Sequence, residues 1–225
     1  MKMTNYDEEA AITDNPLALV AVVAVAVVMV IAFTAPTQSV GVDEGDRAIA
    51  LTGDAYNGSA WYEFNLADYF DEDWEEGDIN GQWVALEFMD TDCPYCIRSA
   101  DEVELGINDF NGNNPNWDGP VVNYVMIATE LNINGHDSSR GEIQAFRDKT
   151  TGYTCGSDAC ENRPGGVHNA PYVDDIDRSI INKWKVQGTP TYILIQPDGV
   201  INWISSNNGG ESLRDAILTN TPRSS

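Results

Sequence analysis

The pattern of apolar and polar positions predicts alternating strands and helices from about residue 55 onward. Two nearly continuous apolar runs, 83–89 and 121–128, are typical of parallel strands buried on both faces of a sheet. A third strand is expected at 61–66, where apolar and polar residues alternate. Helical spacing of apolar residues predicts helices at 96–109, 140–149, 177–185 and 211–218.

A hairpin is expected near the C-terminal end of the chain. Residues 191–195 and 200–204 are apolar, and Gln-Pro-Asp-Gly at 196–199 has the chemistry of a tight turn. Strand, helix, strand, helix, hairpin and final helix together predict a mixed central sheet with helices on both faces. This is an α/β sandwich of three layers.

The N-terminal part contains an apolar run at 17–35 without a charged residue. As a helix it would span about 28 Å, close to the hydrocarbon thickness of a bilayer. A cleaved signal peptide is the competing interpretation, but Lys2 is the only basic residue before the run, where acidic residues outnumber it, and Pro36 follows the run directly. We therefore expect a retained transmembrane helix at 17–35, between a short cytoplasmic tail at 1–16 and an acidic tether at 36–54.

Acidic residues dominate the charge of the chain. Against 12 Lys and Arg there are 36 Asp and Glu, which gives a formal net charge of -24. Nucleic acid is therefore excluded as a general partner, because its phosphates would be repelled. An acidic solubilising surface, salty surroundings or basic partners all fit this charge. The four cysteines form two close pairs, which fit an oxidising compartment better than the cytosol, so we expect the folded part outside the cytoplasm.

The first cysteine pair, Cys93-Pro94-Tyr95-Cys96, lies where a predicted strand changes to a predicted helix. Two thiols at this spacing can close a small disulfide ring and reopen it. The start of a helix stabilises a thiolate on the first sulfur, and the second sulfur can then resolve a mixed disulfide. A C-x-x-C motif at such a position predicts thiol redox chemistry.

Two separate segments resemble the thioredoxin superfamily. One is 85–88 leading to the dithiol at 93–96, and the other is 186–195 with the Pro-Asp-Gly turn at 197–199. Their order, their long separation and the predicted anchor look most like membrane-anchored, extracytoplasmic TlpA-type thioredoxins. The resemblance covers roughly 55–220 and implies a thioredoxin-like domain there.

The resemblance also implies roles for individual residues. Cys93 would be the nucleophile and Cys96 the resolving thiol. Glu87 would lie beneath the dithiol, where burial raises its pKa so that it accepts a proton from Cys96. The alternative for Glu87 is a strand residue that reaches an edge or solvent. Substrate-binding residues would be Pro94, Tyr95, Gly188, Thr189 and a cis Pro190, with the Thr189 backbone free to pair with an extended substrate.

Two departures from the thioredoxin pattern leave the redox direction open. Asp92 stands where thioredoxins usually have tryptophan, and together with Asp90 it opposes a thiolate on Cys93. A less stable thiolate favours the disulfide and thus electron donation. In contrast, the Pro-Tyr pair between the cysteines resembles glutaredoxins and not the Gly-Pro of reducing thioredoxins.

The second cysteine pair, Cys155 and Cys160, lies in an irregular insertion expected at 151–171. A structural disulfide that pins this loop is the first interpretation. The alternatives are a second redox pair and a metal site completed by His168, although such a site lacks a clear fourth ligand. His168 and His136 are both expected on surface loops, and a short tail is expected at 221–225.

These observations predict a single-pass, membrane-anchored thiol–disulfide oxidoreductase that acts outside the cytoplasm. Its substrates would be protein thiols and disulfides, and its electron partner another thiol system, with no dissociable cofactor and no bound metal. One other class is a copper carrier of the same fold, which would need wider cysteine spacing and a later histidine. Another is a non-catalytic interaction module, against which the intact Cys93, Cys96 and Pro190 argue. A thiol peroxidase would need a Pro/Thr arrangement before the cysteine, which is missing.

Overall fold

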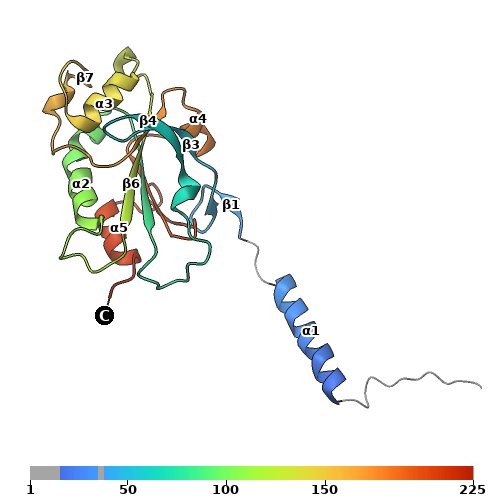
Figure 1. Cartoon of the computed structure of the whole chain (residues 1–225). Coiled ribbons are helices and arrows are strands. Elements are labelled where there is room, and N and C mark those ends of the chain that lie inside the picture. The colour runs from blue at the N-terminus through green and yellow to red at the C-terminus, as the bar shows by residue number, and fades with distance from the viewer. Residues whose placement is uncertain (1–15, 35–37, 225) are drawn as a thin grey trace, which may run out of the picture. The chain divides into compact units, whose positions relative to one another are not determined.

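The computed structural model describes residues 16–34 and 38–224 (Figure 1). Its contacts divide the chain into two units, Met1–Gln38 and Ser39–Ser225. In the first unit, helix α1 spans Pro16–Thr34 and overlaps the predicted anchor. Within the described residues, however, no helix combines the length and the apolar character needed to cross a membrane. The predicted transmembrane helix is therefore not confirmed.

The predicted boundaries around the folded part also differ from the structure. Most of the predicted tail at 1–16, the first two residues of the predicted tether and Ser225 lie outside the described residues. The second unit already begins at Ser39, so residues 39–54 of the predicted tether belong to the same compact unit as the predicted domain. The acidic composition of the segment gave no sign that it belongs to the folded body. Within the segment, Leu51 is only 1% exposed and packs in the core.

Four strands form in this segment and its continuation. Strand β1 (Val40–Gly41) pairs in parallel with β2 (Arg47–Ala48) as a small separate sheet. Strand β3 (Thr52–Tyr56) pairs antiparallel with β4 (Trp61–Asn65), the strand expected at 61–66. The hairpin of β3 and β4 therefore contains a first strand that the hydrophobic pattern did not predict.

The main sheet of the second unit has seven strands among the described residues, in the order β11-β10-β5-β6-β9-β3-β4. Its remaining strands are β5 (Trp83–Met89), β6 (Val122–Thr129), β9 (Tyr172–Asp175), β10 (Thr191–Ile195) and β11 (Ile201–Ile204). The central three, β5, β6 and β9, run parallel, and the others are antiparallel to their neighbours. The sheet is mixed, as predicted, and every residue of β5 is buried.

Helices cover both faces of this sheet, which confirms the α/β sandwich (Figure 1). The helices are α2 (Pro94–Phe110), α3 (Arg140–Asp148), α4 (Ser179–Lys183) and α5 (Leu213–Asn220). Buried side chains of α2, α3 and α5 share one core cluster, whereas those of α4 belong to the cluster on the opposite face. Since side chains alternate along a strand, odd-numbered residues of β5 face the α2 side.

Short elements complete the fold. The single-turn helices are η2 (Leu66–Tyr69), η3 (Ile133–Gly135) and η4 (Cys160–Asn162), and the expected insertion contains the two-stranded sheet β7 (Thr154–Cys155) and β8 (Asp158–Ala159). Helix α4 is shorter than the helix expected at 177–185. Arg178 and Lys185, which flank it, have positive φ angles, a conformation that a right-handed helix cannot continue through.

Candidate active site

The first cysteine pair lies at the carboxyl end of the central strand β5. Cys93 is the N-cap residue of α2, and Pro94 takes the first helical position, where its missing N–H leaves no bond unmade. The helix therefore begins at Pro94, two residues before the start at Cys96 that the apolar spacing predicted. Both sulfurs are free thiols, and Cys93 and Cys96 are only 3% and 2% exposed.

The two thiols differ strongly in acidity. The pKa of Cys93 is lowered to about 5, first by a hydrogen bond from the Cys96 thiol, while burial opposes this shift and the Thr189 side chain supports it. Burial, the bond to Cys93 and the charge of Glu87 raise the pKa of Cys96 far above its usual range. Cys93 is thus the thiolate and Cys96 the thiol of the pair.

The direction of the Cys93 shift is opposite to that expected from Asp90 and Asp92 alone. Both carboxylates are fully buried but are held by donors. Asp90 accepts hydrogen bonds from the backbone N–H groups of Asp92 and Leu131, at 2.7 and 2.8 Å. Asp92 accepts one from the backbone of Gly156 at 2.6 Å and lies 2.5 Å from a ring nitrogen of His136. These hydrogen-bond partners offset the negative charge of Asp90 and Asp92, and the sequence alone does not reveal them.

The peptide bond between Thr189 and Pro190 is cis, as the resemblance implied. The Cys93 thiol donates a hydrogen bond to the Thr189 carbonyl oxygen at 3.3 Å, so the two motifs that lie far apart in sequence meet here. The Thr189 carbonyl is therefore engaged in the thiol form, whereas the resemblance implied a free backbone.

The remaining residues predicted to bind substrate surround Cys93. Tyr95 is 64% exposed, Pro94 is exposed, and Gly188, Thr189 and Pro190 are half-buried. The guanidinium group of Arg98 lies over the Tyr95 ring, 4.5 Å from its centroid. The structure thus gathers the predicted residues around one partly open surface next to the buried sulfur.

Glu87 is buried in the sheet and does not reach an edge. It stands in β5 between Met126 of β6 and Tyr192 of β10, and it is 4% exposed. Burial raises its pKa to about 8, although a hydrogen bond from Tyr192 lowers it. The Tyr192 hydroxyl also lies 3.1 Å from the Ser99 hydroxyl of α2. Tyr192 and Ser99 were not predicted, because the contacts between strands and helix that join them to Glu87 leave no local sequence signal.

Cys155 and Cys160 form a disulfide with a Cα–Cα distance of 4.8 Å. His168 does not complete a metal site with them, because its ring nitrogens lie 2.6 Å from the Tyr172 hydroxyl and 2.8 Å from the Ala100 carbonyl oxygen. His168 is 1% exposed, and burial lowers its pKa to about 3. Its predicted place on a surface loop is therefore wrong, and it is a neutral core residue.

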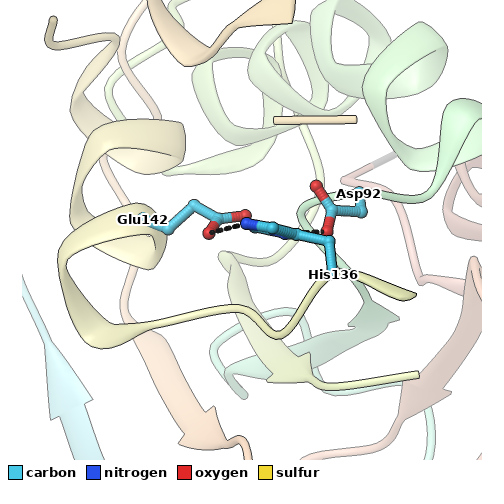
Figure 2. Close-up of side chains that lie close together, drawn as sticks. All are labelled: Asp92, His136 and Glu142. Atoms are coloured by element: carbon cyan, nitrogen blue, oxygen red, sulfur yellow. Dashed lines mark hydrogen bonds and ion pairs between the residues drawn. The ribbon is translucent and has the colours of Figure 1, made fainter. Parts of the chain in front are cut away.

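A second polar cluster lies directly beside the dithiol and was not predicted. The side chains of Asp92, His136 and Glu142 point toward one another from three separate segments (Figure 2). His136 is half-exposed, and its pKa is raised mainly by the hydrogen bond to Asp92. Sequence reasoning missed the cluster because no local spacing links the residues.

No family model and no curated protein matches the chain. Among solved structures, reduced 2-Cys peroxiredoxin from Plasmodium vivax aligns at a TM-score of 0.52 and 18% identity, covering 78% of this chain and 92% of that one. An uncharacterized conserved protein from Geobacillus kaustophilus gives 0.53 and 13%, covering 79% and 78%. A secreted Mycobacterium tuberculosis disulfide oxidoreductase gives 0.46 and 19%, covering 75% and 91%.

The fold is thioredoxin-like. The sheet order, the dithiol at the start of α2 and the cis proline beside it are the features that agree with this fold. At identities this low the likeness concerns the fold and not the activity. Within that fold, this chain has a pair of free cysteines that can form a disulfide.

Proposed function

We propose that the protein is a thiol–disulfide oxidoreductase that exchanges disulfides with protein substrates through Cys93 and Cys96. One observation carries this proposal: the Cys93 sulfur, at the start of α2, lies 3.3 Å from the Thr189 carbonyl oxygen next to the cis proline. The lowered pKa of Cys93, about 5, supplies a thiolate at neutral pH.

In the reducing direction, the Cys93 thiolate attacks one sulfur of a substrate disulfide. A Cys93–substrate disulfide forms, and the other substrate sulfur leaves as a thiolate, which takes up a proton. Cys96 then loses its proton and attacks the Cys93 sulfur, so that the substrate gains two electrons and leaves as a dithiol. The two electrons come from Cys93 and Cys96, which are left joined in a disulfide. The reverse order of steps oxidises a substrate.

Glu87 is the proposed proton acceptor in the second step. Cys96 is buried with a strongly raised pKa, so it needs a nearby base before it can attack. Glu87 has a pKa of about 8, and its charge acts on Cys96, which places a base of suitable strength beside this thiol. Its hydrogen bond from Tyr192 keeps the carboxyl group oriented.

The surface around Cys93 is proposed to receive an extended substrate segment. The Thr189 carbonyl can accept a hydrogen bond from the Cys93 thiol but not from the thiolate, so ionisation of Cys93 frees this carbonyl for a substrate backbone N–H. Gly188 and Pro190 would form the wall on one side, and Pro94 and Tyr95 the wall on the other. No dissociable cofactor is required by this chemistry.

The proposed site of action is outside the cytoplasm. The Cys155–Cys160 disulfide supports this, because such bonds persist in oxidising compartments. Attachment to a membrane through residues 17–35 stays a prediction. Fractionation of cells with a carbonate wash tests it, and labelling of a Cys155→Ser chain with a membrane-impermeant maleimide tests on which side the body lies.

The decisive experiment traps the intermediate. In full-length protein, Cys96→Ser should accumulate disulfide-linked substrates, visible as bands that disappear on reduction, because the resolving sulfur is gone. The matched control, Cys93→Ser, keeps one buried thiol but removes the attacking one and should trap nothing. With dithiothreitol as the electron source, the wild type should reduce insulin, and both variants should lack this activity.

Two other outcomes would replace the proposal. If Cys96→Ser traps no partner while the reduced wild type binds Cu(I) stoichiometrically and Cu(I) protects Cys93 from alkylation, the protein is a metal carrier. If neither exchange nor binding at the thiols is seen, the fold serves as an interaction module.

A further inference from the structure

Three side chains beside the dithiol bring one imidazole and two carboxylates together. Asp92 follows β5, His136 lies after η3, and Glu142 is in the first turn of α3 (Figure 2). Their donor atoms all lie within 4.8 Å of one another. Nδ1 of His136 is 2.5 Å from Asp92 Oδ2, and Nε2 of the same ring is 4.0 Å from Glu142 Oε2.

The carboxylates of this region are not equally satisfied. Asp90 accepts hydrogen bonds from two backbone N–H groups, and Glu130 accepts them from the backbone of Asn132 and Ser138. Glu142 is 3% exposed, and the Thr91 hydroxyl donates to its Oε1 at 2.6 Å. Its Oε2 faces His136 at 4.0 Å, which is too long for a hydrogen bond. The Oε2 atom of Glu142 therefore faces the cluster, with His136 as its ion-pair partner.

The cluster also carries more negative than positive charge. Asp90, Asp92, Glu130 and Glu142 are all buried, and among the described residues the ion pairs of this group involve only His136. Burying several carboxylates with one weak base is unfavourable unless protons or further positive charge enter. A bound cation would neutralise this charge in place of protons.

We propose that Asp92, His136 and Glu142 bind a divalent transition-metal ion of the Zn²⁺ class. One imidazole with two carboxylates suits Zn²⁺ and its neighbours, whereas Mg²⁺ and Ca²⁺ prefer oxygen alone. Three protein donors leave a further position open to water or a ligand, as in zinc sites that are not closed by four side chains. The site is distinct from the two thiols and does not depend on the proposed exchange chemistry.

The geometry allows such a site after a small adjustment. Zinc bonds of about 2.0–2.2 Å place neighbouring donors roughly 3.5 Å apart, and one donor atom from each of the three side chains already lies within 4.8 Å of the other two. The two ring nitrogens of His136 face different carboxylates, and because this side chain is half-exposed, its ring can turn to present one nitrogen to the ion. The hydrogen bonds from Gly156 to Asp92 and from Thr91 to Glu142 hold the carboxylates in place, as outer partners do in metal sites.

The test uses the full-length chain with Cys93 and Cys96 oxidised to a disulfide, so that neither thiol can bind metal. Isothermal titration with ZnCl₂ should show one ion per chain. His136→Gln and Glu142→Gln should each weaken binding by about tenfold or more, since loss of even an outer-shell partner has an effect of this size. Asp137→Asn is the matched control, because it removes a neighbouring exposed carboxylate outside the cluster and should leave binding unchanged.

X-ray absorption of the Zn²⁺-loaded wild type provides a readout that does not depend on how the variants fold. The expected shell contains nitrogen and oxygen donors with an imidazole contribution and no sulfur. Absence of binding by the oxidised chain, sulfur in the shell, or equal affinity in folded His136→Gln and Glu142→Gln would each overturn the proposal. Because the thiols are blocked throughout, failure here leaves the trapping result with Cys96→Ser unaffected.

Discussion

At the scale of single residues, Glu87 shows how the sheet sets the chemistry of one group. The carboxyl group stands on the α2 side of β5, where burial makes ionisation unfavourable and raises its pKa from 4.5 to about 8. In an unfolded chain the same group would ionise near its ordinary value. The folded state therefore binds this proton more tightly than the unfolded state.

This difference predicts a dependence of stability on pH. Since the folded pKa is the higher one, the contribution of Glu87 is fully present below about pH 4.5 and is lost as the pH rises toward about 8. Glu87→Gln should remove this loss, which is on the order of a few kcal/mol. Urea unfolding of both chains at pH 5 and pH 9, in the same redox state, measures it. A parallel loss of stability in the two chains would contradict the assignment.

The site residues whose positions in the fold were anticipated are those whose signal is local. The positions of Cys93 and Cys96 follow from a strand that ends where a helix begins, and Pro190 follows from its flanking motif. The cluster of Asp92, His136 and Glu142 could not be predicted in this way. Its members come from three segments, and only the packing of α3 beside the end of β5 brings them together.

At the scale of secondary-structure elements, the approach of α2 to the sheet depends on a glycine. A Cβ atom at Gly106 would lie 2.2 Å from the hydroxyl oxygen of Tyr124, whose side chain is buried and fixed in the core. Gly106→Ala should therefore lower the free energy of unfolding by about 1–2 kcal/mol, because overpacking outweighs the gain in helix propensity. Thermal or urea denaturation measures this effect.

Gly141 in α3 offers the matched control. A Cβ atom there would lie 2.1 Å from the Tyr153 hydroxyl, but Tyr153 is 45% exposed and can rotate into solvent. Gly141→Ala should change the free energy of unfolding by less than about 0.5 kcal/mol or stabilise slightly. Equal losses in the two variants would show that close packing of α2 on β6 is not the cause.

The disulfide of the insertion gives a second prediction at this scale. Cys155 and Cys160 are five residues apart, so the bond closes a short loop and should contribute about 2 kcal/mol. Cys155→Ser/Cys160→Ser should lower stability by this amount and keep the rate of substrate reduction, as a structural bond requires. An insulin-reduction assay of the folded variant measures the rate, and a large loss would instead favour a second redox pair.

The elements that were missed share a physical cause. Strands β3 and β9 contain acidic residues, and β3 also contains Gly53, so they lack the apolar pattern by which β5 and β6 were found. Their place in the sheet is set by backbone pairing and by a few buried side chains such as Val173 and Ala55. Such pairing between distant segments has no signature along a single chain.

At the scale of the whole molecule, the net charge of -24 predicts that salt stabilises the protein. Repulsion among the acidic side chains opposes the compact state, and added ions screen it. The denaturation temperature should rise as NaCl increases from about 0.01 to about 0.15 M, where the screening length falls to about 8 Å. Calorimetry with EDTA present measures this without interference from metal ions. A constant or falling midpoint would show that the acidic groups repel each other little.

Two of the basic residues, Arg163 and Lys149, donate hydrogen bonds to backbone carbonyl groups. Arg163 is 2% exposed, and its guanidinium group donates to backbone carbonyl oxygens of Phe146, Arg147, Pro164 and Gly166. Lys149 likewise donates to the carbonyl groups of Arg163 and Gly165, at 2.6 and 2.7 Å. Carbonyl groups do not take up protons in mild acid, whereas carboxylates do. The contacts that Arg163 and Lys149 make within residues 146–166 should consequently persist in acidic surroundings that would loosen a contact built from carboxylate pairs.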